Sequence, residues 1–231
     1  MKLTFISDTH TKHRYCENDL PGGDLLIHAG DLSSMGYQHE IQQFCKWFDS
    51  IDNYNFKTFI AGNHDWGFQD NHEKIMEIVN SYKNIDYLQD DMMTIGDDYS
   101  KMVKLWGTPW QPEFYNWAFN LPRGEKLAEK WSKIPMDTDI LITHGPAYGM
   151  LDYTIGGQQV GCQDLYHKIM EVHPKIHVCG HIHWAYGQKN FFGIDFINAC
   201  VLNERYEHEN KPVEIDFDII TKQIDYFYEK K

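Results

Sequence analysis

Five short segments place histidine, aspartate or asparagine directly after an apolar run. They are Ile6-Ser7-Asp8-Thr9-His10, His28-Ala29-Gly30-Asp31, Ala61-Gly62-Asn63-His64-Asp65, Thr143-His144-Gly145-Pro146 and Cys179-Gly180-His181-Ile182-His183. Their carboxylate, carboxamide and imidazole donors suit Mn, Fe, Zn or Co. Asp8 and His10 lie two residues apart, as do His181 and His183, so in an extended chain each pair points to one side. So many donors exceed the needs of one ion, whereas two ions that share a carboxylate would use them.

The apolar runs before these segments predict the strands that position them. We expect buried strands at residues 2–7, 24–28, 57–61, 139–143 and 175–179, and amphipathic helices at residues 39–50, 71–82, 124–133 and 163–173. Strands that alternate with helices predict an α/β fold, in which ligands bind outside the carboxyl ends of the strands. Alternating polarity over residues 213–219 predicts an antiparallel strand with one wet face. No linker or repeat interrupts residues 1–231, which favours a single domain.

Composition excludes several classes of function. The formal charge of -13 has the wrong sign for attraction to long nucleic acids or anionic membranes. No apolar run approaches the roughly 18 residues that span a bilayer, and the N-terminus turns acidic too early for a signal peptide, so we expect a cytoplasmic protein. The five cysteines form no Cys-x-x-Cys pair and are expected to be reduced. Oligomeric state is left open by the sequence.

In this order, the five segments resemble the motifs of the calcineurin-like metallophosphoesterase superfamily. Gly-Asp alone carries little information, but the ordered set is specific. A second segment, Trp106-Gly107-Thr108-Pro109-Trp110-Gln111-Pro112 followed by residues 114–124, is similar to the brain-type metallophosphoesterase-domain-containing proteins and their microbial relatives. This narrower resemblance covers roughly residues 7–216. It implies a four-layer α/β/β/α sandwich of two mixed sheets flanked by helices.

The resemblance also implies the ligand sets of two ions. One ion would be held by Asp8, His10, Asp31 and His183, and the other by Asp31, Asn63, His144 and His181. Asp31 is thus the expected bridge between the ions. Their identity stays open among Mn, Fe, Zn, Co and Ni, because all of these accept such donors.

The expected chemistry is hydrolysis of a small phosphodiester, with a cyclic nucleotide as one possibility. A hydroxide that bridges the two ions would attack phosphorus in line, and the ions would neutralise the phosphoryl oxygens. His64 is predicted to be the general acid that protonates the leaving group, with Asp65 orienting it. Asn63, His64, Trp110 and Tyr115 are the expected substrate contacts. For the aromatic residues between 106 and 119, however, loop packing is the favoured alternative to stacking on a nucleobase.

The other histidines have less specific interpretations. His28, on an apolar strand, is expected to be a satisfied core residue, and seven more are treated as surface or structural: His13, His39, His72, His167, His173, His177 and His208.

Three alternative functions stay open. After Gly30-Asp31 the chain continues Leu32-Ser33-Ser34, without the arginine-containing segment of the protein serine/threonine phosphatases. The loss of that arginine favours diesters over a phosphomonoesterase activity. A nuclease is disfavoured by the net charge. A non-catalytic scaffold is disfavoured by the complete ligand set and His64.

Overall fold

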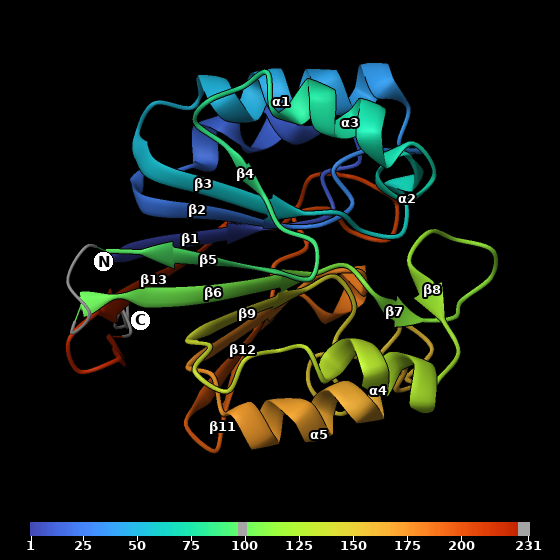
Figure 1. Ribbon diagram of the computed structural model, residues 1–231, viewed down its shortest axis with the longest axis vertical. Coiled ribbons are helices and arrows are strands. Elements are labelled where there is room, and N and C mark those ends of the chain that lie inside the picture. The colour runs from blue at the N-terminus through green and yellow to red at the C-terminus, as the bar shows by residue number, and fades with distance from the viewer. Residues whose placement is uncertain (97–100, 226–231) are drawn as a thin grey trace.

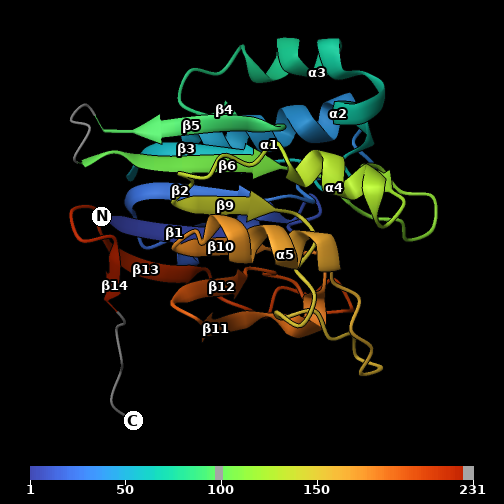
Figure 2. The same cartoon turned by 60° about the horizontal axis from the view of Figure 1, so that its bottom comes forward.

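Two six-stranded sheets pack face to face between two layers of helices (Figures 1 and 2). The structure is a computed structural model that describes residues 1–96 and 101–225. In spatial order the first sheet contains β14 (Gln223–Asp225), β13 (Val213–Asp218), β1 (Lys2–Ile6), β2 (Gly23–Ala29), β3 (Tyr54–Ile60) and β4 (Asp86–Tyr87). Strands β1 to β4 run parallel, whereas β13 pairs with β1 and β14 in the antiparallel sense.

The second sheet has the same mixed character. Its order is β11 (Gly187–Phe191), β12 (Ile194–Asn198), β10 (Ile176–Cys179), β9 (Ile140–Thr143), β6 (Val103–Thr108) and β5 (Asp91–Ile95). The four central strands run parallel, and the edge strands β11 and β5 are antiparallel to their neighbours. A separate pair, β7 (Gln111–Pro112) and β8 (Asn120–Leu121), lies beyond β6.

An apolar core joins the two sheets. Leu3 and Phe5 of β1 face this core, while Ile6 faces the helices on the other side, because successive side chains of a strand point in opposite directions. The opposing sheet contributes residues such as Ile142 and Val178. Burial of apolar surface stabilises this layer by roughly 25 cal/mol per Å². The layer sets the spacing of the two sheets and therefore of their strand ends.

Helices cover both outer faces of the pair of sheets. α1 (Gln38–Ser50), α2 (Trp66–Asp70) and α3 (His72–Val79) cover the first sheet, and α4 (Glu125–Trp131) and α5 (Gln163–Val172) cover the second. Short 3-10 helices span His13–Asp19 and His183–Ala185. At the start of α1, the Glu40 carboxylate accepts hydrogen bonds from the Met35 and Tyr37 backbone N–H groups, which satisfies donors that an α-helix leaves unpaired. The four-layer α/β/β/α prediction is confirmed.

All five predicted buried strands and all four predicted helices are present within a few residues of the expected bounds. The antiparallel strand predicted near the C-terminus is β13. Two central strands were missed. β6 falls partly inside the aromatic segment that was interpreted as a loop, and β12 is buried along its whole length and parallel to β10. Polar residues, Lys104 in β6 and Asp195 in β12, interrupt the apolar runs that would have revealed these strands.

Buried cysteines and histidines outside the site are accounted for by packing. All five cysteines are buried and free, and one of them, Cys200, lies at the site described below. His28 Nε2 lies 2.9 Å from Thr9 Oγ1, and His177 Nε2 lies 2.8 Å from Thr143 Oγ1, so both are core histidines with hydrogen-bond partners. Burial lowers the pKa of each to about 3.

Among the described residues, no helix combines the length and apolar character needed to cross a membrane.

We predict that His177 makes the protein less stable as the pH falls from about 6.5 towards 3. In that window the unfolded chain binds a proton that the folded imidazole resists, so the free energy of unfolding decreases by up to about 1.4 kcal/mol per pH unit. Urea unfolding with a chelator present, at several pH values, measures this slope. His177→Gln should flatten it, whereas His39→Gln, which changes an exposed residue of α1, should follow wild type. Equal slopes for all three proteins would contradict the assignment.

Candidate metal centre and active site

The carboxyl ends of β1, β2, β3, β9 and β10 bring the predicted ligands together. Asp31 Oδ2 lies 3.3 Å from His144 Nε2 and 3.6 Å from His10 Nε2. Asp8 Oδ1 lies 3.5 Å from His183 Nε2, and Asn63 Oδ1 lies 3.0 Å from His144 Nε2.

His181 completes this group of seven candidate ligands. Its backbone N–H donates to both oxygens of Asp8, at 3.1 and 3.0 Å, and its ring centroid lies 5.2 Å from that of His144. The five segments therefore converge on one place, as the sequence predicted.

Four candidate ligands occupy a backbone conformation that L-residues rarely adopt. Their φ values are positive: Asp8 55°, His10 40°, Asp31 56° and His181 68°. Such a conformation costs of order 1–3 kcal/mol per residue and persists only where surrounding structure enforces it. Backbone hydrogen bonds supply part of that constraint, with Asp8 N donating to Gly30 O at 2.9 Å and His10 N donating to Asp31 O at 3.0 Å. The loops thus hold side chains in directions that a relaxed strand end would not give.

Two glycines let the carboxylates approach the backbone, as their positions in the motifs suggested. A Cβ at Gly180 would lie 2.1 Å from Asp8 Oδ2, and a Cβ at Gly62 would lie 2.3 Å from Asp31 Oδ1. Atoms this close would overlap, so the missing side chains leave the space that Asp8 and Asp31 use.

Backbone carbonyls fix the orientation of two candidate imidazole ligands. His144 Nδ1 lies 2.9 Å from Ala29 O, and His183 Nδ1 lies 2.9 Å from Asn203 O. Because a carbonyl only accepts, the Nδ1 atoms carry the protons and donate them. Nε2 is then the nitrogen that faces the carboxylates, which is the usual arrangement of metal-binding histidines.

The donor set fits a metal centre. Both ring nitrogens of His10 are buried and have no hydrogen-bond partner among the described residues, although a buried polar atom normally has one. His10 Nε2 lies 3.6 Å from Asp31 and 4.0 Å from Asp8, where a cation would bind imidazole and carboxylate together. Three groups of side chains each have their donor atoms within 4.8 Å of one another, and Asp31 belongs to two of these groups. Asp8 and Asp31 would supply the negative charge that a divalent cation requires.

Electrostatics at the site match this interpretation. Burial alone would raise the pKa of Asp8, but His183, His144 and His10 outweigh it and hold that pKa well below the usual range. Burial lowers the pKa of His144 and of His183, yet neighbouring carboxylates, Asp31 for His144 and Asp8 for His183, raise both to about 9. The carboxylates therefore attract positive charge strongly enough to draw protons onto buried rings, and cations can take the place of those protons.

His64 stands beside the ligands with one nitrogen engaged. Its Nδ1 lies 2.8 Å from Ser34 O and its ring stacks on Trp117, with centroids 4.1 Å apart and an interplanar angle of 28°. Its ring also meets His10 edge-on, with centroids 4.6 Å apart. These contacts hold the imidazole in one orientation.

The Asp65 carboxylate forms no hydrogen bond with the His64 ring. Its buried carboxylate accepts hydrogen bonds from the backbone N–H groups of Leu32, Ser33 and Gly62 and from the Ser33 hydroxyl. Burial and then Asp31 raise the pKa of Asp65 to about 7. Asp65 thus joins the loops after β2 and β3 and reaches His64 through the segment that carries the Ser34 carbonyl.

A cavity of about 660 Å³ opens over the centre. Its lining includes the candidate ligands His10, Asp31, Asn63, His181 and His183, together with His64, Tyr115 and Trp117.

Trp110 was an expected substrate contact, but it is not among the described residues that line the cavity. Trp110 Nε1 donates to Asp90, and Lys130 Nζ lies 3.7 Å from the centre of the indole. The packing alternative therefore holds at Trp110, whereas Tyr115, 83% exposed, lies at the cavity.

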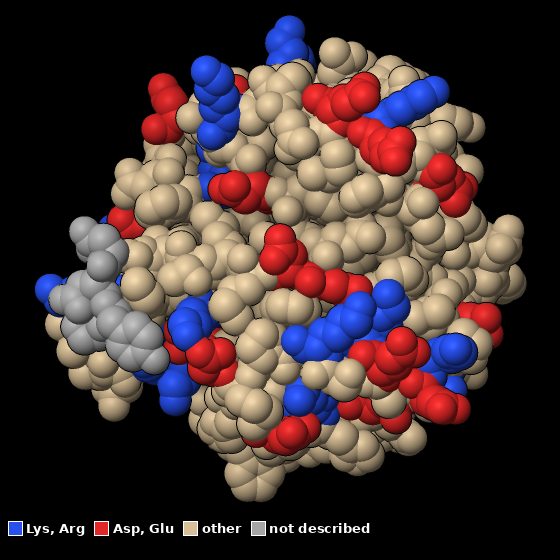
Figure 3. Space-filling model, in the orientation of Figure 1, with Lys and Arg blue, Asp and Glu red and all other residues tan. Residues whose placement is uncertain are grey.

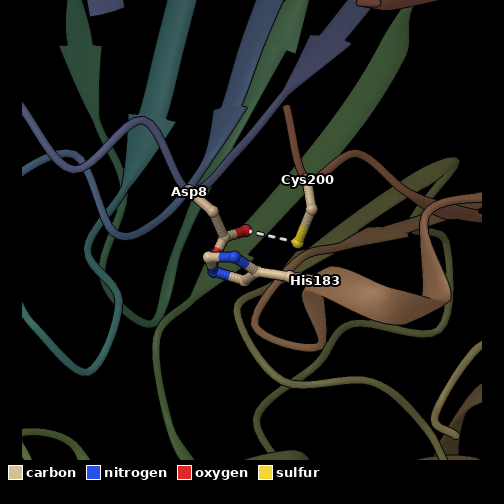
Figure 4. A group of neighbouring side chains, drawn as sticks. All are labelled: Asp8, His183 and Cys200. Atoms are coloured by element: carbon tan, nitrogen blue, oxygen red, sulfur yellow. Dashed lines mark hydrogen bonds and ion pairs between the residues drawn. The ribbon is translucent and has the colours of Figure 1, made fainter. Parts of the chain in front are cut away.

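Nothing in the sequence singled out Tyr206 or Cys200, and Trp117 was hidden in the aromatic segment. Tyr206 lines the cavity and meets the rings of His10 and His183 edge-on, at 4.8 and 5.2 Å. Cys200 Sγ lies 2.9 Å from Asp8 Oδ2 (Figure 4). The density of aromatic residues between 106 and 119 was a signal for Trp117. Tyr206 and Cys200 gave no such signal, because they reach the site from a polar loop and from a strand end far along the chain.

The sequence profile described as Calcineurin-like phosphoesterase matches residues 1–185. The chain belongs to this family. It is 37% identical to metallophosphoesterase domain-containing protein 1 of Homo sapiens over 240 residues, which cover 93% of this chain and 70% of that protein. It is 35% identical to UPF0046 protein T07D4.2 of Caenorhabditis elegans, covering 95% of this chain and 60% of that protein. The predicted resemblance is confirmed.

A solved structure supports the fold. The crystal structure of TT1561 of Thermus thermophilus matches with a TM-score of 0.65 over 97% of this chain and 96% of that one, at 13% identity. At this identity the likeness concerns the architecture alone.

We predict that Gly180→Ala weakens metal binding more than it affects folding. The new Cβ must displace the Asp8 carboxylate or the Ser7 hydroxyl, so affinity for at least one ion should fall about 10–100-fold. Calorimetric titration with Mn²⁺ measures the affinity, and circular dichroism checks the fold. Gly156→Ala is the matched control, because its Cβ would meet nothing nearer than Thr154 Oγ1 at 3.7 Å. Wild-type affinity in Gly180→Ala would refute the close-approach argument.

Proposed function

We propose that this chain is a two-metal phosphodiesterase that hydrolyses a small phosphodiester. The observation that carries the proposal is the position of Asp31, which shares one donor group with His10 and His64 and a second with His144 and His181. A carboxylate that faces two sets of imidazoles is suited to bridge two cations. The family of the chain and the phosphoesterase chemistry of that family support the same interpretation.

The contacts among these residues support the two ligand sets that the family resemblance implies. Asp8, His10, Asp31 and His183 would hold one ion, and Asp31, Asn63, His144 and His181 would hold the other. When bound, the two ions supply activation of water and neutralisation of the phosphoryl oxygens. Manganese is the first metal to test, since oxygen and imidazole donors accept it along with Fe, Zn, Co and Ni.

His64 is the proposed general acid. Its Nδ1 donates to Ser34 O, so proton transfer to the leaving oxygen takes place at Nε2. Trp117 covers one face of the ring and stops it from turning away from the cavity. Histidine is the side chain that most often serves as a general acid or base in enzymes.

Charges in the cavity favour a diester over a monoester. Arg123 is the one lysine or arginine among the described residues of the lining, and its guanidinium donates to the Val160 and Gly161 carbonyls. Glu113 and Glu204 add negative charge to the lining. A dianionic monoester would meet more repulsion from these carboxylates than a singly charged diester, and Arg123 is the one lysine or arginine of the described lining that can offset it.

The remaining wall of the cavity suits a flat, uncharged group of the substrate. Phe114, Tyr115, Trp117 and Ile155 contribute apolar surface there. Offset or edge-on packing of an aromatic group against such side chains is favourable by about 0.5–1.5 kcal/mol beyond its buried area. Cyclic nucleotides are therefore the first natural substrates to test, with the base against this wall and the phosphodiester at the ions.

Long nucleic acids are not expected as partners. The net charge is -13, and on the face shown in Figure 3 the Lys and Arg side chains lie among Asp and Glu side chains instead of forming a continuous basic surface. Attraction to a polyanion needs such a surface.

We predict metal-dependent turnover of an aryl phosphodiester. With Mn²⁺ added, bis(p-nitrophenyl) phosphate should be hydrolysed with a higher kcat/KM than p-nitrophenyl phosphate, and a chelator should abolish both activities. Release of nitrophenol gives the rates. Failure of both substrates under all five metals would refute the proposed function, and a monoester preference would refute the charge argument.

We predict that His64→Ala lowers kcat on a natural diester about 10²–10⁴-fold while both ions remain bound. The control is His72→Ala, because His72 Nδ1 also lies near a backbone carbonyl, Phe68 O at 3.0 Å, but on α3 outside the cavity. The control should keep wild-type kinetics. Comparable kcat for His64→Ala and wild type, at equal metal content, would remove His64 from the role of general acid.

A further inference from the structure

The two oxygens of Asp8 have different surroundings. Asp8 Oδ2 accepts hydrogen bonds from Ser7 Oγ at 2.5 Å, from Cys200 Sγ at 2.9 Å and from the His181 backbone N–H at 3.0 Å. Asp8 Oδ1 accepts from the same backbone N–H at 3.1 Å and faces His183 Nε2 at 3.5 Å. One oxygen is therefore occupied by protein donors, and the other is turned towards the imidazoles.

Cys200 is fixed in place by the backbone that surrounds it. It follows β12, forms a parallel bridge with Ser7 at the end of β1, and its N–H donates to Asn198 Oδ1 at 3.1 Å. Ser7 N donates to Ala199 O at 2.8 Å, and Val201 N donates to Ser7 O at 3.2 Å. The chain end that carries Cys200 is thus joined to the strand end that carries Asp8, although the strands belong to different sheets.

Figure 4 shows the consequence for the side chains. The thiol of Cys200 approaches Asp8 from one side, and the ring of His183 lies on another side of the same carboxylate. Cys200 is fully buried, so it is not placed to react with solutes from solvent.

We propose that Cys200, together with Ser7, is a positioning residue that holds Asp8 Oδ2 and so presents Oδ1 as the single ligand oxygen of the first ion. The inference rests on the metal centre of the proposed function. Hydrogen bonds to a ligand carboxylate fix its orientation, and loss of such a partner typically weakens metal affinity 10–100-fold. Cys200 would thereby set the occupancy of the site formed by Asp8, His10, Asp31 and His183.

Three variants test the proposal. Cys200→Ala removes the donor, Cys200→Ser keeps a shorter donor of similar shape, and Cys179→Ala is the matched control. Cys179 is equally buried, but its thiol donates to Ile197 O at 3.4 Å instead of to a carboxylate. Calorimetric titration of each metal-free protein with Mn²⁺ gives the two affinities, and thermal unfolding in a chelator gives the stability without metal.

The expected result is selective. Cys200→Ala should lower the affinity for one of the two ions about 10–100-fold, and Cys200→Ser should recover most of that lost affinity. Cys179→Ala should bind both ions as wild type does. If both affinities fall equally in Cys200→Ala and Cys179→Ala, in proportion to the loss of stability, the role of Cys200 is merely structural and the proposal is overturned. Unchanged affinity in Cys200→Ala would overturn it as well.

A spectroscopic measurement separates positioning from direct ligation. In the Co²⁺-loaded protein, a thiolate ligand would give a near-ultraviolet sulfur-to-cobalt charge-transfer band that Cys200→Ala abolishes. We expect no such band in wild type, and its presence would overturn the positioning role. Because these readouts are affinities and spectra, they remain decisive if no phosphodiester is hydrolysed, so failure of this inference is distinguishable from failure of the proposed function.

Discussion

Two buried carboxylates constrain the rest of the site. Asp8 and Asp31 are almost fully removed from solvent, and a buried charge without compensation costs several kcal/mol. Backbone N–H groups, a hydroxyl, a thiol and nearby imidazoles provide that compensation. The left-handed backbone at both aspartates is part of the same arrangement, because it directs the carboxylates inwards against their local preference.

The site is assembled from both sheets at once. The first sheet supplies Asp8, Asp31 and Asn63, and the second supplies His144 and His181. His144 Nδ1 is held by Ala29 O of β2, which belongs to the opposite sheet. Since the apolar layer between the sheets sets their spacing, the distances among the candidate ligands depend on core packing as well as on the loops.

Much of the fold was predictable because its signals are local. Short apolar runs that end in glycine and polar residues marked five parallel strands, and helical periodicity marked the four predicted helices. β6 and β12 escaped because Lys104 in β6 and Asp195 in β12 interrupt their apolar runs, and because Trp106 in β6 is equally compatible with a packed loop. The convergence of the five motifs was predictable as well, since parallel strands end at the same edge.

The sequence by itself determined which chemical groups gather at the strand ends and their pairwise spacing along the chain, and these determine the kind of ion that the site suits. Only the tertiary structure decided how those groups are held. It placed the Ser34 carbonyl on His64, turned Asp65 towards Leu32 and Ser33, and packed Trp110 beside Lys130. The reason is physical: local periodicity encodes the face of a strand or helix, whereas a hydrogen bond between Asp8 and Cys200 joins residues 192 apart and depends on how both sheets pack.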